Sequence, residues 1–154
     1  MLRSYLIGLA AGQRGIVPLA ALAAAGRRGD LPDDMPLAKL FSHPLIAAGA
    51  VALSAAEMVG DKQKTAPDRI VPIGLAVRSI TSAYAGAALA PKGQRITGAA
   101  VALGTALASS YVGWKLRVTA MKRYSQTVTG FVEDAAVLAT GLAAVEPRLL
   151  QGRA

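Results

Sequence analysis

Long apolar stretches alternate with short charged stretches along this chain. Residues 96–114 contain no aspartate, glutamate, lysine or arginine, and neither do residues 40–56. A helix needs about 20 mostly apolar residues, within a range of roughly 17–25, to cross a bilayer. Both stretches reach that length, and a helix without a charged face is poorly suited to water. The pattern therefore predicts helices that span a membrane.

Three further stretches reach this length only if charged side chains are buried within them. Residues 4–26 contain Arg14, residues 70–91 contain Arg78, and residues 124–145 contain Glu133 and Asp134. We therefore predict an all-α fold, a polytopic transmembrane helical bundle that forms a single integral membrane domain over residues 1–154. The predicted spans lie near residues 4–26, 43–60, 70–90, 96–114 and 128–145.

The composition narrows the class of protein. Small residues are abundant, with 16 glycines, whereas aromatic residues make up only 5% of the chain. Small residues let transmembrane helices approach closely, so this composition favours a membrane bundle over the alternative, a soluble bundle of alanine-rich helices. With no cysteine and one histidine, neither a metal site nor a cofactor is expected. The basic residues behind the charge of +8 are scattered and lack interleaved aromatic residues, which argues against a nucleic-acid partner.

Arg14 lies about halfway along the first predicted span, where the sequence weakens the helix. Gly12 and Gly15 flank it, and Pro18 cannot donate the amide hydrogen bond that the Arg14 carbonyl would accept. We predict a kink or a short unwound section here, with Arg14 beside freed backbone groups that suit an anion or an acidic side chain. The alternative is a tilted or re-entrant helix whose arginine reaches the lipid headgroups.

Four acidic residues lie within the predicted spans or at their ends. Glu57 and Asp61 are four residues apart and share a helix face, whereas the adjacent Glu133 and Asp134 point about 100° apart. A charged side chain inside a bilayer costs about 2.5 kcal/mol or more, so such groups tend to pair and to serve a function. We predict a substrate- or ion-binding cluster that joins the two buried arginines to these acids, principally to Glu57 and Asp134. The alternative is a set of ion pairs that only fixes how the helices pack.

The ends of the predicted spans carry few orienting signals. Ser42 predicts a helix N-cap before His43 and Pro44, and His43 is expected to be a capping or interfacial side chain. The stretch 115–123 is predicted to be a basic loop. Five spans would place eight basic residues on one side of the membrane and seven on the other, so the positive-inside rule gives no orientation.

Two parts of the chain resemble each other. Ala50-Val-Ala-Leu-Ser54 is similar to Ala100-Val-Ala-Leu-Gly104, and each follows an apolar stretch that contains one arginine. This similarity is compatible with a two-helix internal repeat, an architecture known from transporters whose sites lie at the repeat interface. Chance similarity between alanine-rich helices is the alternative.

Several motifs occur together in an order that identifies a family resemblance. They are Gly12-Gln-Arg14-Gly-Ile-Val-Pro18, Glu57-Met-Val-Gly-Asp61-Lys62, Arg78-Ser79 and Glu133-Asp134. This combination resembles the bacterial membrane family called domain of unknown function 4126, and the resemblance covers nearly the whole chain. The family pattern tends to place threonine before the proline, where this chain has Val17. The resemblance implies a small polytopic membrane protein and carries no established activity.

We expect a multi-pass protein of the bacterial inner membrane that is not an enzyme, because no Walker loop, nucleophile elbow or HExxH pair is present. The leading expectation is a transporter or channel for a small polar or anionic solute. The alternative is an accessory or assembly subunit of a larger membrane complex, with the Gly8-Leu-Ala-Ala-Gly12 motif as its contact surface. A lipid-modifying enzyme is a third, weaker alternative. The expected partners are the lipid bilayer and either further copies of the chain or that larger complex.

Overall fold

The computed structural model describes residues 1–32, 34–35, 37–61 and 70–146, and it is all-α within these ranges, which confirms the predicted class. The sequence predicts a charged turn over residues 61–69, of which residues 62–69 lie outside the described residues. The helices are α1 (Leu2–Gln13), α2 (Val17–Arg28), α3 (Ala38–Ser42), α4 (Pro44–Gly60), α5 (Pro72–Ala88), α6 (Arg95–Ala120) and α7 (Gln126–Val145).

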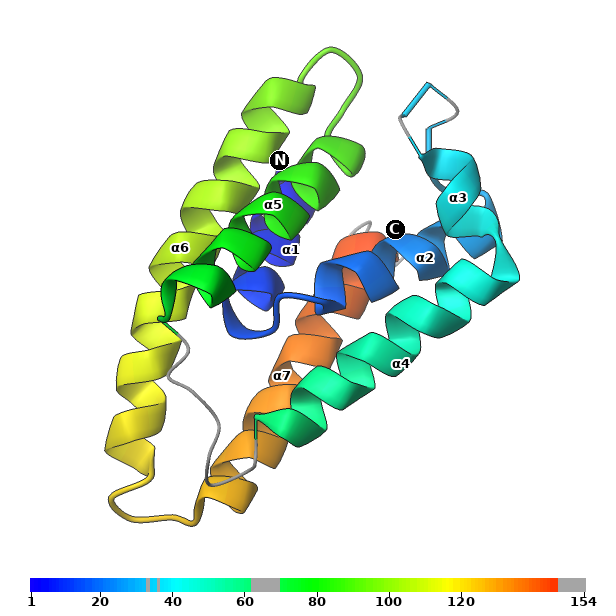
Figure 1. Cartoon of the computed structure of the whole chain (residues 1–154). Coiled ribbons are helices and arrows are strands. Elements are labelled where there is room, and N and C mark those ends of the chain that lie inside the picture. The colour runs from blue at the N-terminus through cyan, green and yellow to red at the C-terminus, as the bar shows by residue number, and fades with distance from the viewer. Residues whose placement is uncertain (33, 36, 62–69, 147–154) are drawn as a thin grey trace, which may run out of the picture.

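The two halves of the first predicted span occupy the centre of the bundle (Figure 1). Helix α1 packs against α5, α6 and α7, whereas α2 packs against α3, α4 and α7. Helix α7 therefore runs past both halves, and the interruption between helices α1 and α2 lies where the two groups of helices meet. This position brings residues from distant parts of the sequence around the break.

Small residues allow the helices around α1 to pack backbone to backbone. A Cβ atom at Gly8 would overlap the Ala102 backbone of α6, and one at Gly86 would overlap Gly98 across the α5–α6 contact. The Ser4 hydroxyl of α1 donates a hydrogen bond to the Gly86 carbonyl at 2.9 Å. Close contacts between small residues are typical of helix packing in membranes. The Gly8–Gly12 motif is thus used inside the bundle, and the expectation that it forms an external contact surface is wrong.

Among the described residues, α6 and α7 combine the length and the apolarity that a membrane span requires. Helix α4 is apolar but shorter, with 17 residues. The first predicted span is two helices of 12 residues each, so neither half reaches the usual length alone. The structure therefore supports two candidate spans, and the five-span arrangement stays a prediction.

Two predicted helix boundaries were wrong. Helix α6 does not end at Trp114 but continues to Ala120, so the basic stretch that begins at Lys115 is largely helical. Helix α4 is capped by His43 rather than Ser42, because the His43 Nδ1 atom accepts the Leu45 amide at 3.3 Å. The extension of α6 matters for function because it moves Arg117 from a predicted loop into the bundle.

Candidate functional site

The helix is interrupted at Arg14, which has an extended backbone with φ −139° and ψ 109°. Helix α1 ends at Gln13 and α2 begins at Val17, so the amides of Gly15 and Ile16 have no helical partners. The carboxylate of Glu57, on α4, accepts both amides, with Oε1 2.8 Å from the Gly15 nitrogen and Oε2 2.9 Å from the Ile16 nitrogen. An acidic side chain at a helix N-terminus is also favoured by the helix dipole. Glu57 therefore occupies the anion position that the break creates.

The carbonyl groups at the end of α1 also find partners outside their own helix. The Ser109 hydroxyl of α6 donates to the Leu9 carbonyl at 3.2 Å, and the Ser110 hydroxyl donates to the Gly12 carbonyl at 2.9 Å. Irregular backbone at membrane depth is tolerated only where such groups are satisfied. Side chains of α4 and α6 thus stabilise the two sides of the break.

Arg14 is 1% exposed and forms the centre of a buried ion-pair network. Its Nε atom donates to Asp134 Oδ1 of α7 at 2.8 Å, and its terminal nitrogen atoms lie 2.6 Å from that oxygen and 2.9 Å from Asp61 Oδ2. The guanidinium also donates a hydrogen bond to the Gln13 carbonyl, at 3.2 Å. The network therefore ties the break to the end of α4 and to the middle of α7.

Arg117 extends this network toward α6. Its guanidinium pairs with the Asp61 carboxylate and donates to the Asp61 carbonyl at 2.8 Å. It also lies 3.7 Å from Glu133 Oε2, which is the longest ion pair of the network among the described residues. Asp61 is consequently shared by two arginines, and Arg117 is shared by two carboxylates.

Arg78, on α5, also lies beside the break. A Cβ atom at Gly15 would lie 3.2 Å from Arg78 Cγ and 3.6 Å from Glu57 Oε1, so these three residues are neighbours. Arg78 is 7% exposed, and its charge is attracted by Glu57 and Asp61 and repelled by Arg14. A larger side chain at Gly15 would crowd Arg78, so limited space favours glycine here, whereas the backbone of Gly15 does not adopt a positive φ.

The structure brings all six predicted charged residues to one region, with partners that differ in part from those predicted. Arg14 lies against Asp134 as predicted, whereas the carboxylate of Glu57 binds backbone amides and also attracts the charge of Arg78. The side chains of Glu133 and Asp134 point in different directions from α7, because adjacent residues of a helix are about 100° apart. Asp134 faces Arg14 and Glu133 faces Arg117.

The three residues predicted to break the helix have different roles. Gly15 lies in the break, and Pro18 lies in the first turn of α2, where a missing amide costs little. Gly12 remains helical within α1, and a Cβ atom there would overlap Ser109. Gly12 therefore serves the close contact with α6 and not the break.

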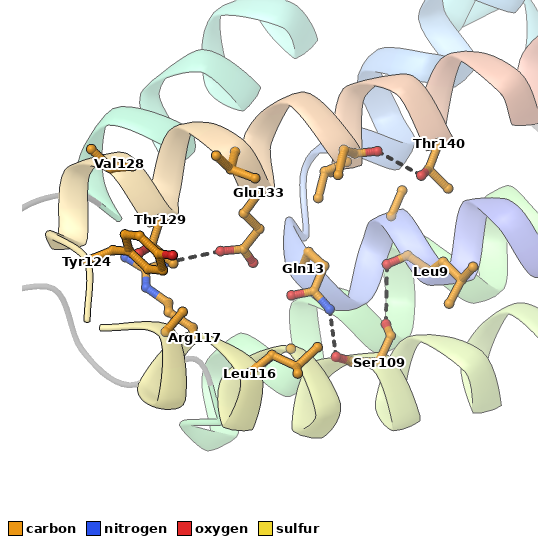
Figure 2. Close-up of a pocket in the computed structure, with 16 residues that line it drawn as sticks. Leu9, Gln13, Ser109, Leu116, Arg117, Tyr124, Val128, Thr129, Glu133 and Thr140 are labelled. Carbon is orange, nitrogen blue, oxygen red and sulfur yellow. Dashed lines mark hydrogen bonds and ion pairs between the residues drawn. The ribbon is translucent and has the colours of Figure 1, made fainter. Parts of the chain in front are cut away.

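A cavity of about 540 Å³ adjoins the network between α1, α6 and α7 (Figure 2). Apolar side chains form most of its wall, among them Leu9, Leu116, Val128, Val132 and Val137. In Figure 2, Arg117 and Glu133 face each other at one end of the cavity, beside Tyr124. Gln13 crosses from α1 to α6 and donates to the Ser109 carbonyl, at 2.6 Å. Pockets with apolar walls and a few placed polar groups are typical of small-molecule sites.

Sequence reasoning missed Arg117, Gln13 and Ser109 as parts of the site. A signal was present, because Ser109, Gly113 and Arg117 recur at intervals of four and share one helix face. Gly113 faces α1, as the overlap between a Cβ atom at this position and the Gln13 side chain shows. The face became visible only once α6 was known to continue beyond Trp114.

The described residues contain no group of three or more histidine or acidic side chains arranged to hold a metal ion. Their carboxylates instead face arginines or backbone amides. The described site is therefore a set of ion pairs and charge-assisted hydrogen bonds that joins α1, α4, α6 and α7.

Comparisons with known proteins give one match. No curated protein and no solved structure matches the chain. The family described as Domain of unknown function (DUF4126) matches residues 2–150, which is nearly the whole sequence. The chain therefore belongs to the DUF4126 family.

Proposed function

We propose that this protein is a small multi-pass protein of the bacterial inner membrane that transports or conducts a small polar or anionic solute. The charged cluster at the helix break would form the pathway. Two candidate spans, α6 and α7, support the membrane location, as do large apolar side chains exposed on α4 such as Leu45, Val51 and Val59. Broken helices that carry buried charges are the recurrent architecture of binding sites in membrane transporters.

The observation that carries this proposal is that Arg117 belongs both to the cavity wall and to the ion-pair network. Its side chain lines the cavity and also pairs with Asp61, whose carboxylate in turn contacts Arg14 at the break. A solute that enters the cavity would therefore meet a guanidinium already linked to the break. Binding in the cavity and rearrangement of the α1–α2 junction are coupled through this chain of ion pairs.

The distances within the network indicate where exchange would begin. Arg14 and Asp134 approach to 2.6 Å, whereas Arg117 and Glu133 are 3.7 Å apart. An anionic or polar group of a solute would replace Glu133 at Arg117 more readily than Asp134 at Arg14. Once Arg117 has a new partner, Asp61 is held less firmly, and one of the links between the break and α6 is lost.

Flux through proteoliposomes tests the proposal. The wild-type protein should move at least one member of a panel of inorganic ions, carboxylates and neutral polar metabolites. Arg117→Gln should abolish that flux, because the link between cavity and break is lost. Arg95→Gln is the matched control on the same helix, since Arg95 forms an exposed ion pair with Asp34 outside the cavity. A wild-type protein that moves nothing, or an Arg117→Gln variant with unchanged flux, would contradict the proposal.

The exposed apolar side chains of α4 favour a second candidate, an accessory subunit or a homo-oligomer. Leu45 is 75% exposed and Val59 is 65% exposed, and the described contacts of α4 are mainly with α2 and α3. A partner helix could cover this face as well as lipid could. Extraction in a mild detergent distinguishes these roles: a stoichiometric foreign subunit favours the accessory role, and a discrete homo-oligomer that retains flux favours transport.

A further inference from the structure

We infer that the cleft between α6 and α7 is a specific site for an anionic phospholipid. One acyl chain would lie in the cavity, and the phosphate would rest on the basic turn, the α6–α7 connection that carries Lys122 and Arg123. This inference rests on the membrane location in the proposed function but not on transport. The lipid chain and the solute of the proposed function would occupy the same cavity, so the two ligands would exclude each other.

The first observation is the shape of the cleft. Helices α6 and α7 follow each other along the chain but diverge, and α1 forms the floor between them (Figure 1, Figure 2). Leu116, Val128 and Val132 line the cavity and are 65%, 53% and 68% exposed. The cavity therefore opens sideways between the two candidate membrane spans, onto the surface that a bilayer would cover. A hydrocarbon chain fits such a wall, because the large side chains that line the opening are apolar.

The second observation is the charge at one end of the cleft. The cavity extends to the basic turn, because Ala120 and Tyr124 line the cavity wall and lie directly before and after the turn in the sequence. Lys122 and Arg123 are exposed, and neither forms an ion pair among the described residues. Lys115, five residues before the end of α6, is also exposed. Clusters of basic residues at the end of a membrane helix attract anionic headgroups.

These two observations select the occupant. A second copy of the chain could fill the apolar wall, but it would not need cations beyond the end of the groove. A fatty acid could fill the apolar wall, but with its carboxylate at Arg117 it would leave the exposed Lys122 and Arg123 without an anion. A phospholipid satisfies both features, because its chain occupies the wall while its phosphate lies outside at the basic turn. Tyr124, at the boundary, has the amphipathic side chain typical of the membrane interface.

The single tryptophan of the chain provides a direct reporter. Trp114 follows Gly113, which lines the cavity, and it lies one turn before Arg117. Bromine atoms on a lipid chain quench tryptophan fluorescence at short range. The protein is reconstituted in phosphatidylcholine vesicles, and brominated phosphatidylglycerol or brominated phosphatidylcholine is added in rising mole fraction. Quenching is then compared between the two lipids.

Brominated phosphatidylglycerol should reach half of its maximal quenching at a mole fraction roughly ten- to thirtyfold lower than brominated phosphatidylcholine, given two basic side chains at the headgroup. Lys122→Gln with Arg123→Gln should remove this preference. Lys39→Gln with Lys92→Gln is the matched control, since it removes two exposed charges away from the turn. Ala136→Phe should fill the cavity and abolish the saturable quenching. Ala135→Phe, at the neighbouring exposed position outside the cavity lining, should leave it unchanged.

Three results would overturn the inference, and they separate it from the proposed function. Equal quenching by the two lipids would place the protein in the bilayer without a specific lipid site. A dimer whose formation shields Trp114 from both lipids would show that a second copy occupies the cleft. Absence of quenching by either lipid would show that the protein is not in the bilayer, and the proposed function would fail together with the lipid site.

Discussion

Two helices of this protein contain a buried arginine followed by small residues, yet only one of them is interrupted. The first predicted span breaks at Arg14, whereas α5 runs without interruption from Pro72 to Ala88 through Arg78. In α5 the hydroxyls that follow the arginine bond back to the helix itself, with Thr81 donating to the Val77 carbonyl at 3.0 Å and Ser82 to the Ser79 carbonyl at 3.2 Å. A buried arginine and small neighbours are therefore not enough to break a helix.

The interrupted helix differs in what surrounds it. Pro18 removes one amide, and Glu57 of α4 then binds the two amides that the break exposes. Arg14 meanwhile pairs with Asp134 and Asp61, from two other helices. The break therefore depends on partners from distant parts of the chain, and Pro18 only weakens the helix locally. Substitutions that remove these partners, or that move proline to α5, test this assignment.

The largest effect is expected for Asp134→Asn. Arg14 would stay buried at 1% exposure but would lose its closest charged partner. Removing one member of a buried ion pair costs about 3–5 kcal/mol, so the free energy of unfolding in mixed micelles should fall by that amount. Asp30→Asn removes the partner of the exposed Arg28 and should change stability by about 0–1 kcal/mol. Equal effects of the two substitutions would show that the network does not hold the break.

Ser82→Pro recreates in α5 the spacing between Arg14 and Pro18. The proline would remove the amide hydrogen bond to the Arg78 carbonyl inside a helix, where no break exists. A proline in a helix interior costs about 3 kcal/mol or more, so unfolding should be easier by at least that amount. Ser82→Ala, which keeps the amide, is the control and should cost clearly less. If Ser82→Pro were as stable as Ser82→Ala, proline spacing alone would be sufficient to specify the break.

Glu57→Gln tests the carboxylate that binds the break. Glutamine keeps one acceptor oxygen but turns the other position into a donor that faces an amide. Hydrogen bonds to charged groups contribute about 1.5–3 kcal/mol each, and the loss of one such bond should lower stability by that amount. Hydrogen exchange at the Gly15 and Ile16 amides should become faster, whereas exchange in α5 should not change. Unchanged exchange at both amides would contradict the role of Glu57.

The two helices also show which features of the fold and of the site can be predicted from the sequence. The all-α class follows from unbroken apolar stretches, and the weak point in the first span follows from Gly15 and Pro18, because both depend on local chain chemistry. The partners of the break do not follow, because Glu57 binds backbone groups and leaves no pattern of complementary charges. Arg117 was assigned to a loop because it follows Lys115 closely, although burial of α6 against α1 extends that helix. Local chemistry thus predicts where a helix is weak, and tertiary contacts decide whether it breaks and what stabilises it.

Pro18→Ala should have the smallest effect on the interruption itself, although proline is the most visible helix-breaking signal in the sequence. Pro18 lies in the first turn of α2, where the amide has no partner in its own helix. Its replacement should lower stability by about 0.4–1 kcal/mol because the unfolded chain gains conformational freedom, and by roughly a further 1.5 kcal/mol because the buried ring loses two methylene groups. The interruption should persist, because Glu57 still binds Gly15 and Ile16, and slow hydrogen exchange at those two amides would confirm it. If α1 and α2 instead merged into one helix, Arg14 would leave Asp134, and proline rather than the surrounding helices would be the cause of the break.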